Sequence, residues 1–173
     1  CKVMLGLFKA IRCEKLIDGS GSAPINDAVV LVEGAKIKAV GKEGDVKMPD
    51  AAKIIEADEG TVMPGLTDVH IHLRNIVGFN AYHKAVTSSS ERLLHAVSNA
   101  KKVLKMGFTT VRDAGGIEAV DLKHGIEEGL ILGPRIIASR QLISQTAGHA
   151  DTHFLPLEWV KSQSSNRLAD GAD

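Results

Sequence analysis

Residues 62–73 read VMPGLTDVHIHL, and this stretch decides the expected fold and points to a site. The Pro-Gly pair at 64–65 breaks the chain before a strand predicted over residues 66–73. Because side chains on a strand alternate between faces, Asp68, His70 and His72 share one face. Two adjacent neutral imidazoles can bind one divalent metal, and such a polar row is costly to bury without a partner. The alternative is a half-buried strand whose polar residues face solvent.

The bulk composition excludes several classes of function. The 173 residues include 21 basic and 21 acidic side chains, so no net charge attracts nucleic acid or an acidic membrane. Aromatic residues make up 3%, too few for platforms that stack single-stranded nucleic acid. The longest apolar runs are too short to span a bilayer. With only Cys1 and Cys13, we expect a reducing compartment and a cytoplasmic location.

The first third of the chain is predicted to be rich in β-structure. Short apolar or alternating runs at residues 9–17, 27–32, 36–40 and 53–57 are separated by Gly-, Asp- and Ser-containing turns. None of these runs carries a cluster of catalytic side chains, which indicates a structural role.

After residue 64 the pattern changes to alternating strands and helices. Strands are predicted at 66–73, 108–112 and 135–139, with helices at 88–106 and 117–128 between them. Ser88 and Glu91 form a capping-box pattern, and Gly107 follows the last apolar position of the first helix. Such alternation predicts parallel strands joined by helical crossovers, as in a doubly wound sheet or a (β/α)₈ barrel. Residues 141–173 show no clear element and predict a long functional loop or a disordered end.

Three segments together resemble the amidohydrolase superfamily of metal-dependent hydrolases. The sequence PGLTDVHIH at 64–72 resembles its first barrel strand, and GFTTVRDAGG at 107–116 resembles the second strand of one branch. The sequences GPR at 133–135 and SQTAGHAD at 144–151 resemble the third strand and its loop. That branch contains imidazolonepropionase-like enzymes, Xaa-Pro dipeptidases (prolidases) and carboxypeptidases that remove basic residues.

The resemblance implies an α/β fold in two parts. Residues 1–62 would form part of a small β-sandwich, completed by strands from the far end of a longer chain. Residues 63–173 would form about three βα units of a (β/α)₈ TIM barrel. Because a whole barrel needs roughly 250 residues, we expect this chain to be the N-terminal part of a larger enzyme, inactive by itself.

The resemblance also assigns a site. His70 and His72 match the family's two first-strand histidines, which bind the more buried of two divalent metal ions, expected to be zinc. The other ligands would be a fourth-strand lysine, histidines on strands five and six, and an aspartate on strand eight, all beyond Asp173. In that scheme a metal-bound hydroxide attacks an amide carbonyl, and the aspartate carries the proton to the leaving amine.

The leading hypothesis is therefore a binuclear metal-dependent amidohydrolase that cleaves an amide or peptide-like bond, such as a dipeptidase or carboxypeptidase. We expect a small amide or dipeptide substrate, no nucleic-acid or membrane partner, and a homo-oligomer when the protein is complete. One alternative is a cyclic-amide hydrolase of the imidazolonepropionase type. Others are a non-catalytic relative that keeps the barrel for assembly, and a short binding module that is already complete.

Further polar residues are candidates with competing interpretations. Asp68 either orients a neighbouring ligand or is a core residue bonded to backbone. Of Arg112 and Asp113, at most one can face the site, and the simpler expectation is a salt bridge that braces a loop. His149 and Asp151 lie on the glycine-containing loop after the third strand, where they either reach the substrate or are solvated.

The remaining candidates are weaker. His153 continues the alternation of the loop beyond Asp151. We expect His83, His95 and His124 to be ordinary surface or helix residues, and Cys13 to be an inert thiol within a strand.

Overall fold

The structure is a computed structural model, and it describes residues 8–149, 151, 155–156, 158 and 167–171. The chain divides into two compact units, Cys1–Pro64 and Gly65–Asp173. The division falls at the Pro-Gly pair that precedes the histidine-bearing strand.

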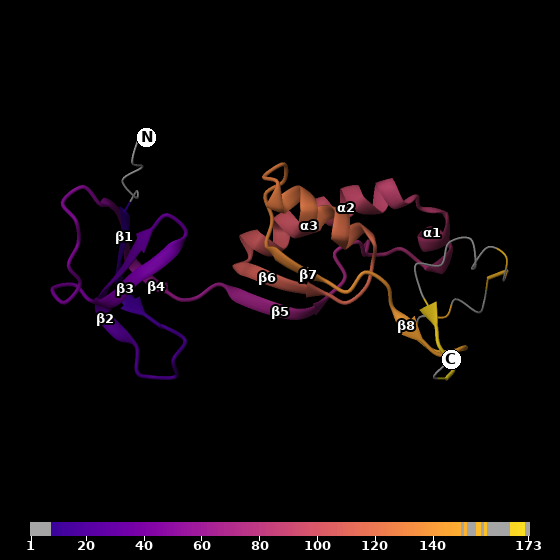
Figure 1. The fold of residues 1–173 in the computed structure, drawn as a ribbon, viewed down its shortest axis with the longest axis horizontal. Helices are drawn as coiled ribbons and strands as arrows, with labels where there is room; N and C mark the ends of the chain where they lie inside the picture. The colour runs from indigo at the N-terminus through magenta and orange to yellow at the C-terminus, as the bar shows by residue number, and fades with distance from the viewer. Residues whose placement is uncertain (1–7, 150, 152–154, 157, 159–166, 172–173) are drawn as a thin grey trace. The chain divides into compact units, whose positions relative to one another are not determined.

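The first unit contains one four-stranded sheet (Figure 1). The strand order is β3-β2-β1-β4, in which β1 runs antiparallel to β2 and parallel to β4. The bounds are β1 (Phe8–Leu16), β2 (Ile25–Glu33), β3 (Lys36–Lys42) and β4 (Lys53–Val62). The strands predicted from the alternating apolar runs are therefore all present; β2, β3 and β4 are longer than predicted, and β1 is shifted by one residue.

Both faces of this sheet carry buried apolar side chains. Along β2, Ala28 and Val30 belong to one buried cluster, whereas Val29 and Leu31 belong to another. Because successive strand residues point to opposite faces, the two clusters lie on opposite sides of the sheet. Cys13 is buried in the first cluster, with its Sγ atom 3.7 Å from the Ala28 carbonyl oxygen. This environment agrees with the expectation of an inert thiol.

The second unit is built on three parallel strands in the order β5-β6-β7. Their bounds are β5 (Leu66–Ile71), β6 (Phe108–Asp113) and β7 (Arg135–Ala138). Two main helices, α2 (Ser89–Lys105) and α3 (Glu118–Glu127), connect them and lie over one face of the sheet (Figure 1). The prediction of parallel strands with helical crossovers is therefore confirmed.

The core of this unit lies between the sheet and the two helices. Val111 and Ile136 of the sheet are buried there, together with Ala96 and Ala100 of α2 and Leu122 of α3. The alanines allow close approach of the helix, which explains why small residues are the fully buried ones in α2. Leu94, an apolar position that also fits the helical spacing, is instead 70% exposed.

The ends of the helices follow the local sequence. The Ser88 side chain accepts a hydrogen bond from the Glu91 backbone N–H at 3.1 Å, so the predicted N-cap of α2 is present. A short helix, α1 (Ala81–Val86), was not predicted from the sequence, although Asn80 caps it by accepting from the His83 backbone N–H. Its six residues are too few to show an amphipathic period.

Among the described residues after β7, two short strands pair with each other. Strand β8 (Ile143–Ser144) pairs in parallel with β9 (Arg167–Leu168), within a stretch for which the sequence predicted no clear element. Two-residue strands carry no periodic signal, so only the tertiary pairing defines them. Among the described residues, no helix has the length and apolar content needed to cross a membrane.

Candidate metal site and its surroundings

The two candidate metal ligands lie at the carboxyl end of β5. His70 is in the strand and is exposed, whereas His72 follows the strand and is half-buried. Their ring centroids are 5.4 Å apart and the ring planes make an angle of 78°. The structure therefore places the two side chains next to each other, as the spacing of two residues predicted.

A backbone contact indicates the tautomer of His72. Its Nδ1 atom lies 3.2 Å from the carbonyl oxygen of Gly115, in the segment after β6. A carbonyl oxygen only accepts, so Nδ1 must carry the proton in this contact. In the neutral ring Nε2 then keeps its lone pair, which is the form that a metal ligand requires.

The donor pair fits a divalent cation in type and spacing. Two imidazoles bound to one tetrahedral zinc ion through nitrogens about 2.1 Å away would have centroids roughly 5 Å apart, close to the observed 5.4 Å. Within the described ranges, no group of three or more His, Cys, Asp or Glu side chains is arranged to hold a metal. The pair thus supplies two suitable ligands and needs others to complete a coordination sphere.

Asp113 is buried at the end of β6, with 1% of its surface exposed. Its Oδ2 accepts from the Leu73 backbone N–H at 2.8 Å, and its Oδ1 accepts from the Gly115 N–H at 3.0 Å. Burial raises the pKa of this carboxyl, although the two N–H groups favour its charged form. The side chain therefore links the segments that follow β5 and β6.

Arg112 and Asp68 both make contacts to the backbone of β5. Arg112 Nε donates to the Val69 carbonyl oxygen at 2.6 Å, and Asp68 Oδ1 accepts from the His70 N–H at 2.9 Å. The salt bridge expected to brace Arg112 and Asp113 is not the arrangement observed, since both side chains bond to backbone groups instead. For Asp68, the bond to the His70 backbone N–H is compatible with either of its two interpretations.

A hydrogen bond within the loop after β7 closes a turn. Asp151 Oδ2 accepts from the Ala147 backbone N–H at 2.7 Å, while His149 is exposed in the same turn. Neither side chain forms a metal-binding group with the histidines of β5 within the described ranges. His153 lies outside the described residues.

A buried glutamate that the sequence analysis did not single out lies beside these loops. Glu118, the first residue of α3, is 1% exposed. Its Oε1 accepts from Arg92 Nε at 3.0 Å and from Ser89 Oγ at 3.1 Å, and its Oε2 lies 3.5 Å from Arg74 Nη1. In the sequence it resembles any acidic residue in the first turn of a helix, so no local signal identifies it.

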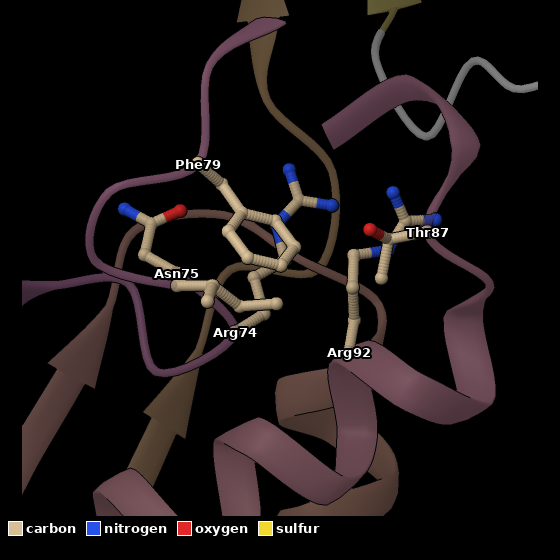
Figure 2. A pocket seen from close by; sticks show the side chains of 6 residues that line it. Arg74, Asn75, Phe79, Thr87 and Arg92 are labelled. Atoms are coloured by element: carbon tan, nitrogen blue, oxygen red, sulfur yellow. The ribbon is translucent and has the colours of Figure 1, made fainter. Parts of the chain in front are cut away.

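The two arginines also line a small cavity of about 80 Å³. Figure 2 shows side chains from the loop after β5 and from the start of α2 around this cavity. The lining residues are Arg74, Asn75, Ile76, Phe79, Thr87 and Arg92. Neither candidate metal ligand is among them.

The other histidines occupy ordinary positions. His83 and His95 contact the Phe79 ring, with centroids 5.1 Å and 6.3 Å away, and His124 lies in the last turn of α3. Among the described residues none of them belongs to a group of three or more possible metal ligands.

The fold and these residues match a known family. The sequence profile of the amidohydrolase family matches residues 61–171, which include all three parallel strands and both histidines. The chain belongs to the amidohydrolase family.

Individual relatives agree with this assignment. The chain is 31% identical over 153 residues to ochratoxinase from Aspergillus niger, and the match covers 82% of this chain and 30% of that protein. It is 25% identical over 186 residues to imidazolonepropionase from Idiomarina loihiensis, covering 93% of this chain and 43% of the relative. The chain thus spans less than half the length of these relatives.

Solved structures show the same architecture. The crystal structure of A. niger ochratoxinase superposes with a TM-score of 0.84 at 26% identity, covering 96% of this chain and 41% of that one. A prolidase complexed with N-methylphosphonate-L-proline gives a TM-score of 0.79 at 28% identity, covering 95% and 41%. The fold is thus the N-terminal portion of an amidohydrolase, a β-sandwich part followed by the first part of the TIM barrel, as the sequence predicted.

Proposed function

We propose that His70 and His72 hold a divalent metal ion in a hydrolase that cleaves an amide or peptide-like C–N bond. The observation that carries this proposal is the contact between His72 Nδ1 and the Gly115 carbonyl oxygen, which leaves the Nε2 lone pair free. The adjacent His70 ring and membership of the amidohydrolase family support it.

Within this proposal the chain's own residues bind and orient. A divalent ion in such a site lowers the pKa of a coordinated water and polarises the carbonyl that is attacked. His70 and His72 supply two nitrogen ligands, and the Asp68 carboxylate accepts a hydrogen bond from the His70 backbone N–H. We propose zinc, two ions per site, and further ligands from parts of the protein beyond Asp173.

The proposed substrate is a dipeptide or another small molecule with a peptide-like bond. The structural likeness to a prolidase bound to a proline-containing phosphonate supports this class. His149 and Asp151, on the loop after β7, are proposed to contribute on the substrate side. We further propose that the complete protein is a cytoplasmic homo-oligomer.

A second candidate is hydrolysis of a cyclic amide. It is favoured by the relative named imidazolonepropionase, whose match covers 93% of this chain, more than that of the ochratoxinase sequence. Both candidates use the same histidine pair, so they differ in substrate rather than in the chemistry of the site.

The metal assignment is tested by measuring bound metal. Zinc content by mass spectrometry is compared for the wild-type protein, a His70→Ala/His72→Ala variant and a His124→Ala control on α3. We expect the double variant to lose bound zinc and the control to retain it. The same zinc stoichiometry in the double variant would overturn the assignment of these ligands.

The reaction class is tested on the complete protein that contains this chain. Xaa-Pro dipeptides, an N-acyl amino acid and imidazolonepropionate are incubated with it, with and without a chelator. Cleavage of the dipeptides that is lost on chelation and in the double variant supports the proposal. Preferential turnover of the cyclic amide favours the second candidate, and turnover unaffected by chelation contradicts both.

A further inference from the structure

Asp113 is a buried carboxylate for which the proposed reaction has no direct use. It is 1% exposed and occupies the helix-facing side of β6, two residues after the fully buried Val111. Placing a carboxylate there is costly unless its oxygens are hydrogen-bonded. Both oxygens are bonded, to the backbone N–H groups of Leu73 and Gly115.

These two bonds lead directly to His72. Leu73 is the residue after His72, and the carbonyl oxygen of Gly115 is the acceptor for His72 Nδ1. One carboxylate oxygen of Asp113 therefore accepts from Leu73, the residue after His72. The other accepts from Gly115, whose carbonyl oxygen contacts the His72 ring. The backbone bond from the Ala114 N–H to the Ile71 carbonyl oxygen, at 2.9 Å, ties the same two segments together.

We propose that Asp113 is a positioning residue that fixes the tautomer and orientation of His72 through the Gly115 carbonyl group. By holding the Leu73 and Gly115 N–H groups, it keeps that carbonyl oxygen within hydrogen-bond distance of Nδ1. The proton therefore stays on Nδ1, and the lone pair stays on Nε2. The consequence for metal binding rests on the proposed function, whereas the tautomer itself does not.

The geometry distinguishes this role from ordinary packing. Any buried carboxylate needs hydrogen-bond donors, but the two donors here come from two different chain segments, one next to His72 and one that contacts its ring. A neighbouring side chain also restricts the Gly115 segment, because a Cβ atom at Gly115 would lie 2.5 Å from Cγ of Leu142. The Leu142 side chain therefore lies close against the backbone at Gly115.

The tautomer is measured first in the wild-type, metal-free protein. Nitrogen-15 NMR of the imidazole ring at pH 8 reports which nitrogen of His72 carries the proton. We expect Nδ1–H for His72, and slow hydrogen exchange at the Leu73 and Gly115 amides. A proton on Nε2 in the wild-type protein would overturn the proposal without any substitution.

The role of the carboxylate is tested with Asp113→Asn, which keeps the size of the side chain. The amide NH₂ group replaces one acceptor oxygen, so one of the two backbone N–H groups loses its hydrogen bond. Asp121→Asn, an exposed carboxylate on α3, is the control. We expect a mixture of His72 tautomers and a fall of about 10- to 100-fold in zinc affinity for Asp113→Asn. The control should change neither.

The outcomes separate this inference from the proposed function. If Asp113→Asn leaves both the tautomer and the zinc affinity unchanged, Asp113 does not position His72, whatever the reaction is. If the tautomer shifts while the wild-type protein binds no zinc, the positioning role stands and the metal assignment fails. A lower melting temperature with an unchanged tautomer would show a purely structural role and would also overturn the inference.

Discussion

Removal of the Glu118 carboxylate should strongly destabilise the second unit. The side chain is almost fully buried and contacts Arg92, Ser89 and Arg74. In Glu118→Ala these partners remain, and two positive charges lose their counter-charge in a partly dehydrated place. Breaking one side of a buried ion pair costs about 3–5 kcal/mol.

The expected magnitude is at the lower end of that range. The Arg74 and Arg92 side chains are 22% and 21% exposed, so water partly solvates them once Glu118 is removed. Alanine also has a high helix propensity, so the change at the start of α3 adds little cost. We therefore expect a loss of about 3 kcal/mol in the free energy of unfolding, or about 10 °C in melting temperature.

The assay is urea unfolding followed by circular dichroism at 222 nm, which reports chiefly on α2 and α3. The matched control is Glu127→Ala on the same helix, where the carboxylate is 60% exposed and lies 3.8 Å from Lys123 Nζ. That control should change stability by less than about 0.5 kcal/mol. A double-mutant cycle with Arg92→Ala should give a coupling energy of at least about 1 kcal/mol.

The reasoning fails if Glu118→Ala costs no more than Glu127→Ala. It also fails if the losses of Glu118→Ala and Arg92→Ala simply add, because that result would mean that the two side chains do not interact in solution. In either case the buried charge cluster would not be the feature that joins α2 to α3.

Two further substitutions test close contacts elsewhere in the chain. Gly65→Ala should destabilise the protein by about 1–3 kcal/mol in thermal unfolding, because a Cβ atom there would collide with the Thr109 side chain. The control Gly60→Ala places its Cβ atom at an ordinary contact distance and should be tolerated. Equal losses of stability in the two variants would refute this prediction. Hydrogen bonds from Thr146 hold the pKa of Asp170 below its ordinary value, so ionised Asp170 favours this contact at neutral pH and the benefit is lost as the pH falls through the lowered pKa. An NMR titration should show that Thr146→Val raises the pKa of Asp170 towards that of a free aspartate, and no change would contradict the assigned contact.

The local elements of the second unit could be predicted because their signals lie within a few residues. The apolar period and the Ser88 cap define α2, and alternation with a preceding Pro-Gly pair defines the strand that carries His70. The sequence did not predict α1 or the β8–β9 pair, because these elements are too short to show a periodic pattern of apolar residues. The length of a segment thus decided whether its sequence was informative.

Side-chain partners were harder to predict than elements. The sequence allowed Arg112 and Asp113 a salt bridge, but in the structure one bonds to the Val69 carbonyl oxygen and the other to two backbone N–H groups. The Val69 carbonyl oxygen and the Leu73 N–H lie 43 and 40 residues earlier in the chain, and whether they come within reach depends on how β5 pairs with β6. No pattern within the sequence of β6 contains that register.

The amino-acid sequence by itself determined the order of the longer strands and helices and placed His70 and His72 side by side, because strand alternation is a local property of the backbone. It also carried the motifs by which the family could be recognised. Only the tertiary structure showed that His72 Nδ1 lies within hydrogen-bond distance of the Gly115 carbonyl oxygen, that Asp113 bonds to both segments, and that Glu118 is buried beside two arginines. These contacts join residues from different strands and helices, so they exist only once packing has brought those elements together.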